Sequence, residues 1–146
     1  MSFIDAYLPT HDGLLPLWML FVSFVSVVNS VQAYYSIHYT SRVYNGLSKA
    51  SIKKLAFKSP VTPLSARTFG TWTLIQSLVR MYAAYNISEP AFYQLAFCTY
   101  AVAFGHFISE WLIYHTTSWG SGLCGPVLVS TGTMLWMALQ WSYYVR

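Results

Sequence analysis

The sequence predicts an all-α integral membrane protein whose single domain, residues 1–146, is a bundle of four transmembrane helices. Two observations carry this prediction. Only 8% of the residues are charged and 55% are apolar, whereas soluble domains carry about a quarter charged residues. The apolar residues also form long stretches without a polar face, as expected of helices that contact lipid. Segments of about ten alternating residues, typical of membrane β-barrels, are not seen.

The first two predicted spans cover residues 14–37 and 66–87, each close to the length of about 20 residues that a spanning helix needs. Trp18 lies near one end of the first span and Tyr34 near the other, where interfacial aromatic residues are common. Pro63 discourages a helix before Leu64. Ser65 is therefore the expected N-terminal cap of the second span.

The last two predicted spans cover residues 91–114 and 126–144. A tight turn at 86–90 precedes the third span, and its brevity makes the second and third helices antiparallel neighbours. A Gly- and Ser-rich stretch at 116–125 is typical of a loop and separates the third span from the fourth.

Between the first two spans, residues 40–65 form a loop that contains no acidic residue. Short, positively charged loops stay in the cytosol, so both termini and the turn at 86–90 are expected on the opposite side. The charges suit anionic lipid headgroups or an acidic protein face rather than nucleic acid, because the membrane tethers the loop at both ends. The basic residues are Arg42, Lys49, Lys53, Lys54 and Lys58.

Charged residues inside predicted spans are costly and need a partner or a purpose. Counted from the turn at 86–90, Arg67 and Glu110 both lie at about 30 Å. They either form a salt bridge at the cytosolic interface or each contact headgroups and water. Arg80 lies only about 10 Å from the turn. Its expected partners are Gln76, Thr99 and Tyr100, with a partner protein or a lipid as the alternative.

His106 and Glu110 are spaced i, i+4 and share one helix face. Three interpretations stay open: a hydrogen-bonded pair that holds helices together, an acid/base pair facing a sterol-sized cavity, or two metal ligands. A metal site needs three or four ligands, and the other histidines lie in tails or near helix ends, so no metal site is predicted. Cys98 and Cys124 show no metal-ligand spacing and are expected to be packing residues.

Small residues at four-residue spacing let two helices approach closely. Ala101, Gly105 and Ser109 form such a series in the third span, and Ala66 and Gly70 form a shorter one in the second. They fit contacts within the bundle, with another protein, or with a second copy of the chain.

Longer motifs resemble the ergosterol-biosynthesis scaffold family of the endoplasmic reticulum membrane, whose members tether the sterol C-4 demethylation complex. The resemblance covers about residues 14–140. It is carried by Leu64–Thr73, which includes Arg67, Gly70 and Trp72, and by Trp18–Gln32, Val79–Arg80, Glu89–Pro90, Gly105–Glu110 and Gly125–Met137.

The resemblance implies a multi-pass protein of the endoplasmic reticulum that acts without catalysis and without a cofactor. Its implied partners are the sterol C-4 methyl oxidase, the 3β-hydroxysteroid dehydrogenase/C-4 decarboxylase and the 3-keto sterol reductase. The C-24 sterol methyltransferase and the C-14 demethylase are further partners in this picture. The alternative function is a membrane sterol-binding protein, or a sterol isomerase-like enzyme, that uses His106 and Glu110.

Overall fold

The structure is a computed structural model that describes residues 8–46 and 59–145. In these residues the chain is helical, with turns and loops and no β-strand. The helices are α1 (Leu15–Tyr35), α2 (Ile37–Val43), α3 (Pro63–Tyr85), α4 (Pro90–Leu112), α5 (Ser121–Leu139) and α6 (Trp141–Tyr144).

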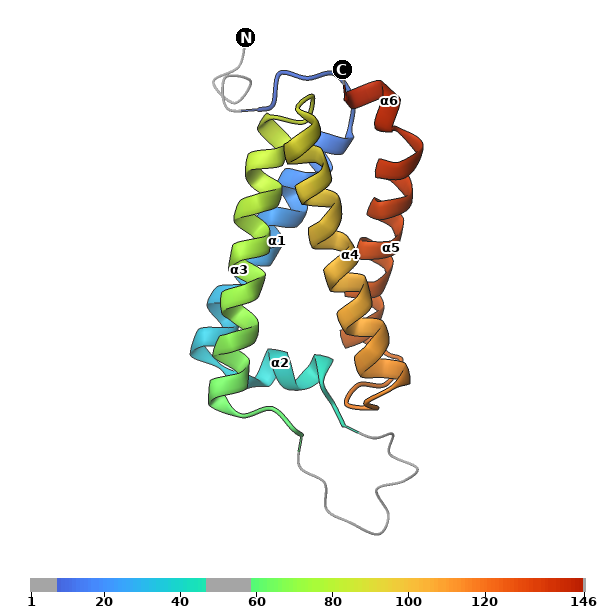
Figure 1. The fold of residues 1–146 in the computed structure, drawn as a ribbon. Helices are drawn as coiled ribbons and strands as arrows, with labels where there is room; N and C mark the ends of the chain where they lie inside the picture. The colour runs from blue at the N-terminus through green and yellow to red at the C-terminus, as the bar shows by residue number, and fades with distance from the viewer. Residues whose placement is uncertain (1–7, 47–58, 146) are drawn as a thin grey trace.

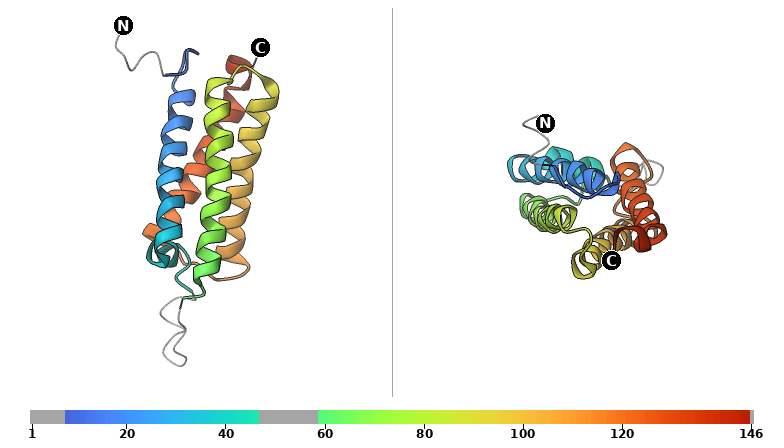
Figure 2. Two further views of the ribbon diagram at one scale, coloured as in Figure 1. Left: turned by 90° about the vertical axis from the view of Figure 1, so that its left-hand side faces the viewer. Right: turned by 90° about the horizontal axis from the view of Figure 1, so that it is seen from above.

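The four long helices α1, α3, α4 and α5 run side by side around a common centre (Figures 1 and 2). The α3–α4 turn, the start of α1 and the short α6 lie at one end of the bundle. Helix α2 lies across the other end, where α3 and α4 have diverged (Figure 1). The bundle is therefore closed by the turn at one end and by α2 at the other.

Three of the described helices are long and apolar enough to cross a membrane. Their mean hydropathies are 1.6 for α1, 1.3 for α4 and 1.4 for α5. Helix α3 has 23 residues but is more polar, because it carries Arg67 and Arg80 together with several hydroxyl side chains. Three of the four predicted spans are therefore candidate membrane-spanning helices, and the fourth, α3, is a further long helix beside them.

The residue that caps the start of α3 differs from the predicted one. Thr62 caps the helix, because its hydroxyl accepts a hydrogen bond from the Ser65 amide at 3.1 Å and the Ser65 hydroxyl accepts one from the Thr62 amide at 2.8 Å. Pro63 occupies the first turn, where the missing N–H costs nothing. Ser65 is the second half of this capping box rather than the cap itself.

Two other boundaries also differ from the predicted ones. The first apolar segment is broken at Ser36, whose backbone is extended and whose hydroxyl accepts a hydrogen bond from the His38 amide. The predicted loop 40–65 therefore begins inside α2. The predicted fourth span corresponds to α5, which begins at Ser121 rather than Pro126 and ends at Leu139. Helix α6 follows after Gln140.

Helices α1 and α3 pack closely because Gly70 has no side chain. The Ser30 hydroxyl donates a 2.7 Å hydrogen bond to the Gly70 carbonyl oxygen. A Cβ atom on Gly70 would lie 3.0 Å from the Ser30 carbonyl oxygen and 3.0 Å from the Tyr34 ring. The hydroxyls of Tyr34 and Thr71 are also hydrogen-bonded, at 2.6 Å. The backbones of α1 and α3 thus approach closely, whereas in a soluble core interlocking apolar side chains would separate them.

At the end with the turn, tyrosine side chains connect α4, α5 and α6. The Tyr93 hydroxyl donates a 2.7 Å hydrogen bond to the Met137 carbonyl oxygen, and the Tyr144 hydroxyl accepts one from the Leu15 amide at 3.3 Å. Both tyrosines are buried among Leu15 and Met19 of α1. At this end Tyr93 therefore joins α4 to α5, and Tyr144 joins α6 to the start of α1.

Candidate functional site

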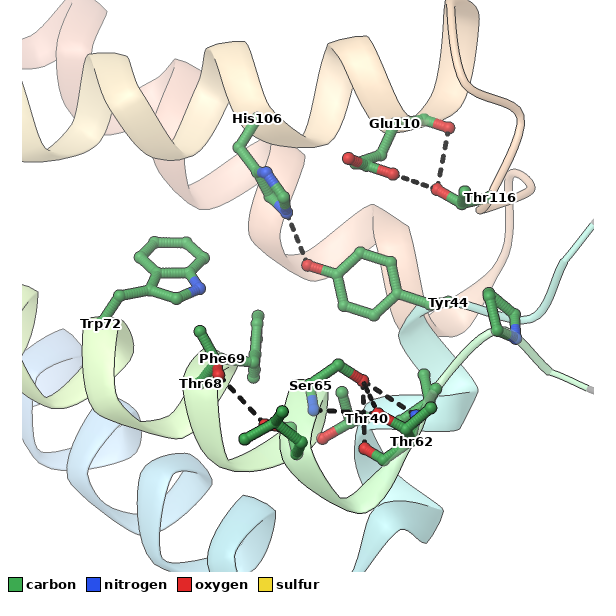
Figure 3. Close-up of a pocket in the computed structure, with 13 residues that line it drawn as sticks. Thr40, Tyr44, Thr62, Ser65, Thr68, Phe69, Trp72, His106, Glu110 and Thr116 are labelled. Atoms are coloured by element: carbon green, nitrogen blue, oxygen red, sulfur yellow. Dashed lines mark hydrogen bonds between the residues drawn. The ribbon is translucent and has the colours of Figure 1, made fainter.

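A pocket of about 500 Å³ lies where α3 and α4 diverge above α2. Its walls come from three stretches that are distant in sequence, residues 40–44, 60–72 and 106–116. Figure 3 shows its polar side chains converging from α4, from α3 and from the segment after α2. The lining residues are Thr40, Tyr44, Pro60, Val61, Thr62, Leu64, Ser65, Thr68, Phe69, Trp72, His106, Glu110 and Thr116.

The segment after α2 forms the floor of this pocket and is fixed to the loop between α4 and α5. The Thr117 hydroxyl donates a 2.6 Å hydrogen bond to the Val43 carbonyl oxygen. The Gly46 amide donates one of 2.9 Å to the Thr116 carbonyl oxygen. Gly122 lets α5 pass directly against the backbone of Arg42, where any Cβ would collide with the carbonyl oxygen.

Four rings surround the centre of the pocket. The Tyr44 hydroxyl and His106 Nε2 are hydrogen-bonded at 2.6 Å (Figure 3). Trp72 contacts His106 with ring centroids 5.5 Å apart, and Phe69 contacts Trp72 at 5.4 Å and Tyr44 at 5.8 Å. These edge-to-face contacts are a favourable geometry for aromatic rings, and they fix the His106 side chain in place.

Burial raises the pKa of the Tyr44 phenol well above its usual range, and the charge of Glu110 raises it further. Both effects disfavour the phenolate, because a buried anion loses hydration and is repelled by a second anion. Tyr44 thus remains a neutral phenol at physiological pH, and its O–H group can donate to His106.

Glu110 is bonded to the loop that follows α4. The Thr116 hydroxyl donates to Glu110 Oε2, and the Thr116 amide donates to the Glu110 carbonyl oxygen at 3.0 Å. Arg67 is exposed, and within residues 8–46 and 59–145 no ion pair joins it to Glu110. Of the two interpretations of these charges, the structure favours separate contacts with the surroundings over a salt bridge.

His106 and Glu110 follow each other on one face of α4 but have separate partners, Tyr44 for the first and Thr116 for the second. The predicted hydrogen-bonded pair is thus not formed between the two side chains themselves. Each instead attaches α4 to a different segment. No group of three metal-ligating side chains lies together in the part of the chain that the structure describes.

Arg80 is buried between α3 and α4 and has the partners that the sequence predicts. Its Nε donates to Thr99 Oγ1 at 2.9 Å, and one terminal nitrogen donates to Gln76 Oε1 at 2.8 Å and to the Thr99 carbonyl oxygen at 3.2 Å. Its guanidinium carbon lies 4.0 Å from the centre of the Tyr100 ring. The cation is therefore satisfied inside the bundle.

The two series of small residues occupy different surroundings. Ala66 and Gly70 are buried in the α1–α3 contact. Gly105 is exposed, and a Cβ atom there would meet nothing within 4 Å. Ser109 donates its hydroxyl to the His106 carbonyl oxygen, and Ala101 is half-buried. The bundle thus leaves Gly105 uncovered and covers Ala101 and Ser109 in part.

The remaining predicted residues lie on the surface or outside the described segments. Arg42 is exposed, with its guanidinium carbon 5.9 Å from the Tyr39 ring centre. Cys98 is exposed rather than packed in the core, and Cys124 is half-buried. Four of the predicted basic residues, Lys49, Lys53, Lys54 and Lys58, lie outside the described residues.

Sequence reasoning missed Tyr44 and Thr116 as pocket residues. Both lie in segments between helices, where no periodic pattern indicates which way a side chain points. Their partners, His106 and Glu110, were found because a histidine and an acid are rare within apolar helices.

Comparisons with known proteins identify relatives over most of the chain. The profile of the family described as "Erg28 like protein" matches residues 15–135. Ergosterol biosynthetic protein 28 of Candida albicans is 47% identical over 100% of this chain and 99% of its own length. The Saccharomyces cerevisiae protein of the same name is 44% identical over 90% and 83%.

More distant relatives extend beyond fungi. The Ergosterol biosynthetic protein 28 homolog of Homo sapiens is 30% identical over 86% of this chain and 84% of its own length. No solved structure matches the chain significantly. The match over most of the chain, together with near full-length relatives at high identity, shows that this chain belongs to the Erg28 family.

Proposed function

We propose that this chain is a non-catalytic membrane scaffold that holds sterol-biosynthesis enzymes together at the endoplasmic reticulum. Its relatives carry names that place them in ergosterol biosynthesis. The proposed partners are the C-4 methyl oxidase, the 3β-hydroxysteroid dehydrogenase/C-4 decarboxylase and the 3-keto reductase, with the C-24 methyltransferase and the C-14 demethylase as further ones. Such tethering raises the effective concentration of one enzyme near the next.

The observation that carries the proposal is the uncovered face of α4. Gly105 opens onto free space, and its neighbour Val102 is 61% exposed. Glycine on an apolar, exposed helix face permits another membrane helix to approach closely. Within the bundle, Gly70 likewise lets α1 and α3 approach closely. This parallel supports the α4 face around Gly105 as a contact with a different protein.

We further propose that α3 crosses the membrane as a fourth span. Its 23 residues measure about 34 Å at ~1.5 Å per residue, enough for a hydrocarbon core of about 30 Å. Arg80, its most deeply placed charge, is bonded to Thr99 and Gln76 within the bundle. Glycosylation tags inserted at residue 52 and after residue 146 test this: we expect modification only at the carboxyl terminus, and modification at both sites would exclude the topology.

The enzyme alternative has less support from the geometry. An acid/base pair would need His106 and Glu110 to be available to one substrate atom, whereas each is bonded to a separate segment of the chain. Turnover of a sterol by the purified protein, lost in His106→Ala and Glu110→Gln variants that still bind their partners, would establish the alternative.

The scaffold is tested by purification of the tagged full-length chain in mild detergent, with the bound enzymes identified by mass spectrometry. We expect the C-4 demethylation enzymes to be recovered with the wild type and to be lost with Gly105→Leu. Gly132→Leu on α5 is the matched control, because Gly132 is equally exposed and open. Unlike Gly105, it has large residues, Leu128 and Trp136, at four-residue spacing. Absence of these enzymes from the wild-type preparation would refute the proposal.

A further inference from the structure

The pocket at α2 adjoins a second cavity of about 270 Å³ between the four long helices, and both cavities are lined by Phe69 and Trp72. On α3 the lining residues run from Leu64 to Arg80, which is about 24 Å at ~1.5 Å per residue. The pocket at α2 alone follows α3 for about 12 Å, close to one leaflet of a hydrocarbon core of about 30 Å. The space therefore has the length and the direction of a lipid that lies parallel to the helices.

Hydrogen-bonding groups of the pocket gather at its α2 end. Glu110 Oε2 is bonded to Thr116, while its second carboxylate oxygen accepts no hydrogen bond from the described residues. Thr40 Oγ1 is buried and also has no partner. The protein encloses Thr40 Oγ1, so the free Glu110 oxygen is the acceptor that the hydroxyl of a ligand in the pocket would reach. His106 lies on the same helix face, one turn from Glu110 (Figure 3).

The same end of the pocket is unsuited to a phospholipid headgroup. Among the described residues that line it there is neither a lysine nor an arginine. A phosphate would be drawn to such a cation and would be repelled by the Glu110 carboxylate. Among the described lining residues, the Glu110 carboxylate thus favours a neutral ligand with a hydroxyl donor over an anionic headgroup.

Aromatic and aliphatic side chains form much of the rest of the pocket wall. Phe69 and Trp72 meet nearly at right angles, at 89°, with centroids 5.4 Å apart, and Leu64 and Val61 continue the wall towards the opening. A rigid, fused-ring ligand loses less conformational entropy against such a wall than a flexible acyl chain does.

We propose that this pocket binds a sterol, with its hydroxyl at Glu110 and its rings against Phe69 and Trp72. The choice of a sterol among hydroxylated lipids rests on the proposed role in sterol synthesis. Binding here involves no chemical step. It makes the scaffold a holding site for the molecules on which its partner enzymes act.

The test uses the full-length protein in lipid nanodiscs and a photoactivatable sterol as the probe. Thr68→Trp fills the pocket, because Thr68 lines it from the exposed start of α3. Ile75→Trp is the matched control, because Ile75 lies on the same helix, is 56% exposed and lines neither cavity. We expect saturable labelling that falls about tenfold in Thr68→Trp, equal to ~1.4 kcal/mol of binding free energy, and persists in Ile75→Trp.

Competitors distinguish the class of ligand. Unlabelled sterol should displace the probe, and a sterol analogue without the hydroxyl, diacylglycerol and phosphatidylcholine should not. Equal displacement by diacylglycerol, or equal labelling of Thr68→Trp and the wild type, would overturn the proposal.

Recovery of the sterol enzymes from the same preparations separates this inference from the scaffold function. Enzymes recovered without saturable labelling would overturn sterol binding alone. Labelling without recovery of enzymes would overturn the scaffold alone.

Discussion

Gly70→Ala should destabilise the bundle by placing a methyl group inside the α1–α3 contact. The new carbon would lie 3.0 Å from the Ser30 carbonyl oxygen and 3.0 Å from the Tyr34 ring, closer than ordinary van der Waals contact on both sides. The Ser30 oxygen belongs to the backbone of α1, so the helix as a whole has to move. Such overpacking costs about 1–3 kcal/mol.

Substitution of glycine by alanine inside a helix also has a favourable effect of about 1 kcal/mol. Gly132→Ala supplies this effect alone, because its Cβ meets nothing within 4 Å. The difference in unfolding free energy between the two variants therefore isolates the overpacking, about 1–3 kcal/mol.

Thermal unfolding in mild detergent, followed by tryptophan fluorescence, measures this difference. For a chain of this size about 1 kcal/mol corresponds to a shift of about 2–4 °C in Tm, so Gly70→Ala should unfold several degrees below Gly132→Ala. Equal Tm values for the two variants would show that α1 and α3 do not meet at Gly70.

Two further variants test the polar contacts. Thr99→Val removes the hydroxyl that accepts from Arg80 Nε at 2.9 Å and should cost about 1–3 kcal/mol, since a buried charged donor loses a partner. Thr71→Val removes an exposed hydrogen bond to the neutral Tyr34 hydroxyl and should cost less. Equal Tm values for these two variants would contradict the role of Thr99. Tyr44→Phe removes the 2.6 Å hydrogen bond to His106 and should cost about 1 kcal/mol. Because the pKa of Tyr44 is raised on folding, its contribution to stability should be full below pH ~10 and decline at higher pH. The stability of the wild type should therefore approach that of Tyr44→Phe in alkaline unfolding experiments, and a constant difference between them would refute the burial of the phenol.

The pairing of α3 with α4 could be predicted because it depends on a local signal. The turn at 86–90 makes α3 and α4 neighbours, and counting residues from it brings Thr99 to the level of Arg80. The same counting placed Arg67 at the level of Glu110. It gave no indication of the loop after α4, where the Thr116 hydroxyl donates to the Glu110 carboxylate. Depth along a helix is fixed by sequence spacing, whereas the choice among partners at one depth depends on loop conformation.

The pocket could not be predicted, because α2 and the segment after it define its floor. Tyr44 and His106 are 62 residues apart in the chain, and no pattern relates them. The small-residue pattern was equally ambiguous: Gly70 and Gly105 carry the same signal in the sequence, yet one is enclosed and the other open. Only the packing of α1 against α3 distinguishes them.

The anchoring of the chain on both sides of residues 47–58 has a consequence for how the family can diversify. Before this stretch, Val43 and Gly46 are bonded to Thr117 and Thr116; after it, Thr62 and Ser65 start a helix on their own. Lengthening a connection between two fixed points costs little, about 0.6 kcal/mol for each doubling. Homologues can therefore gain or lose residues here, and with them contacts to other molecules, while the cavity beneath α4 keeps its shape.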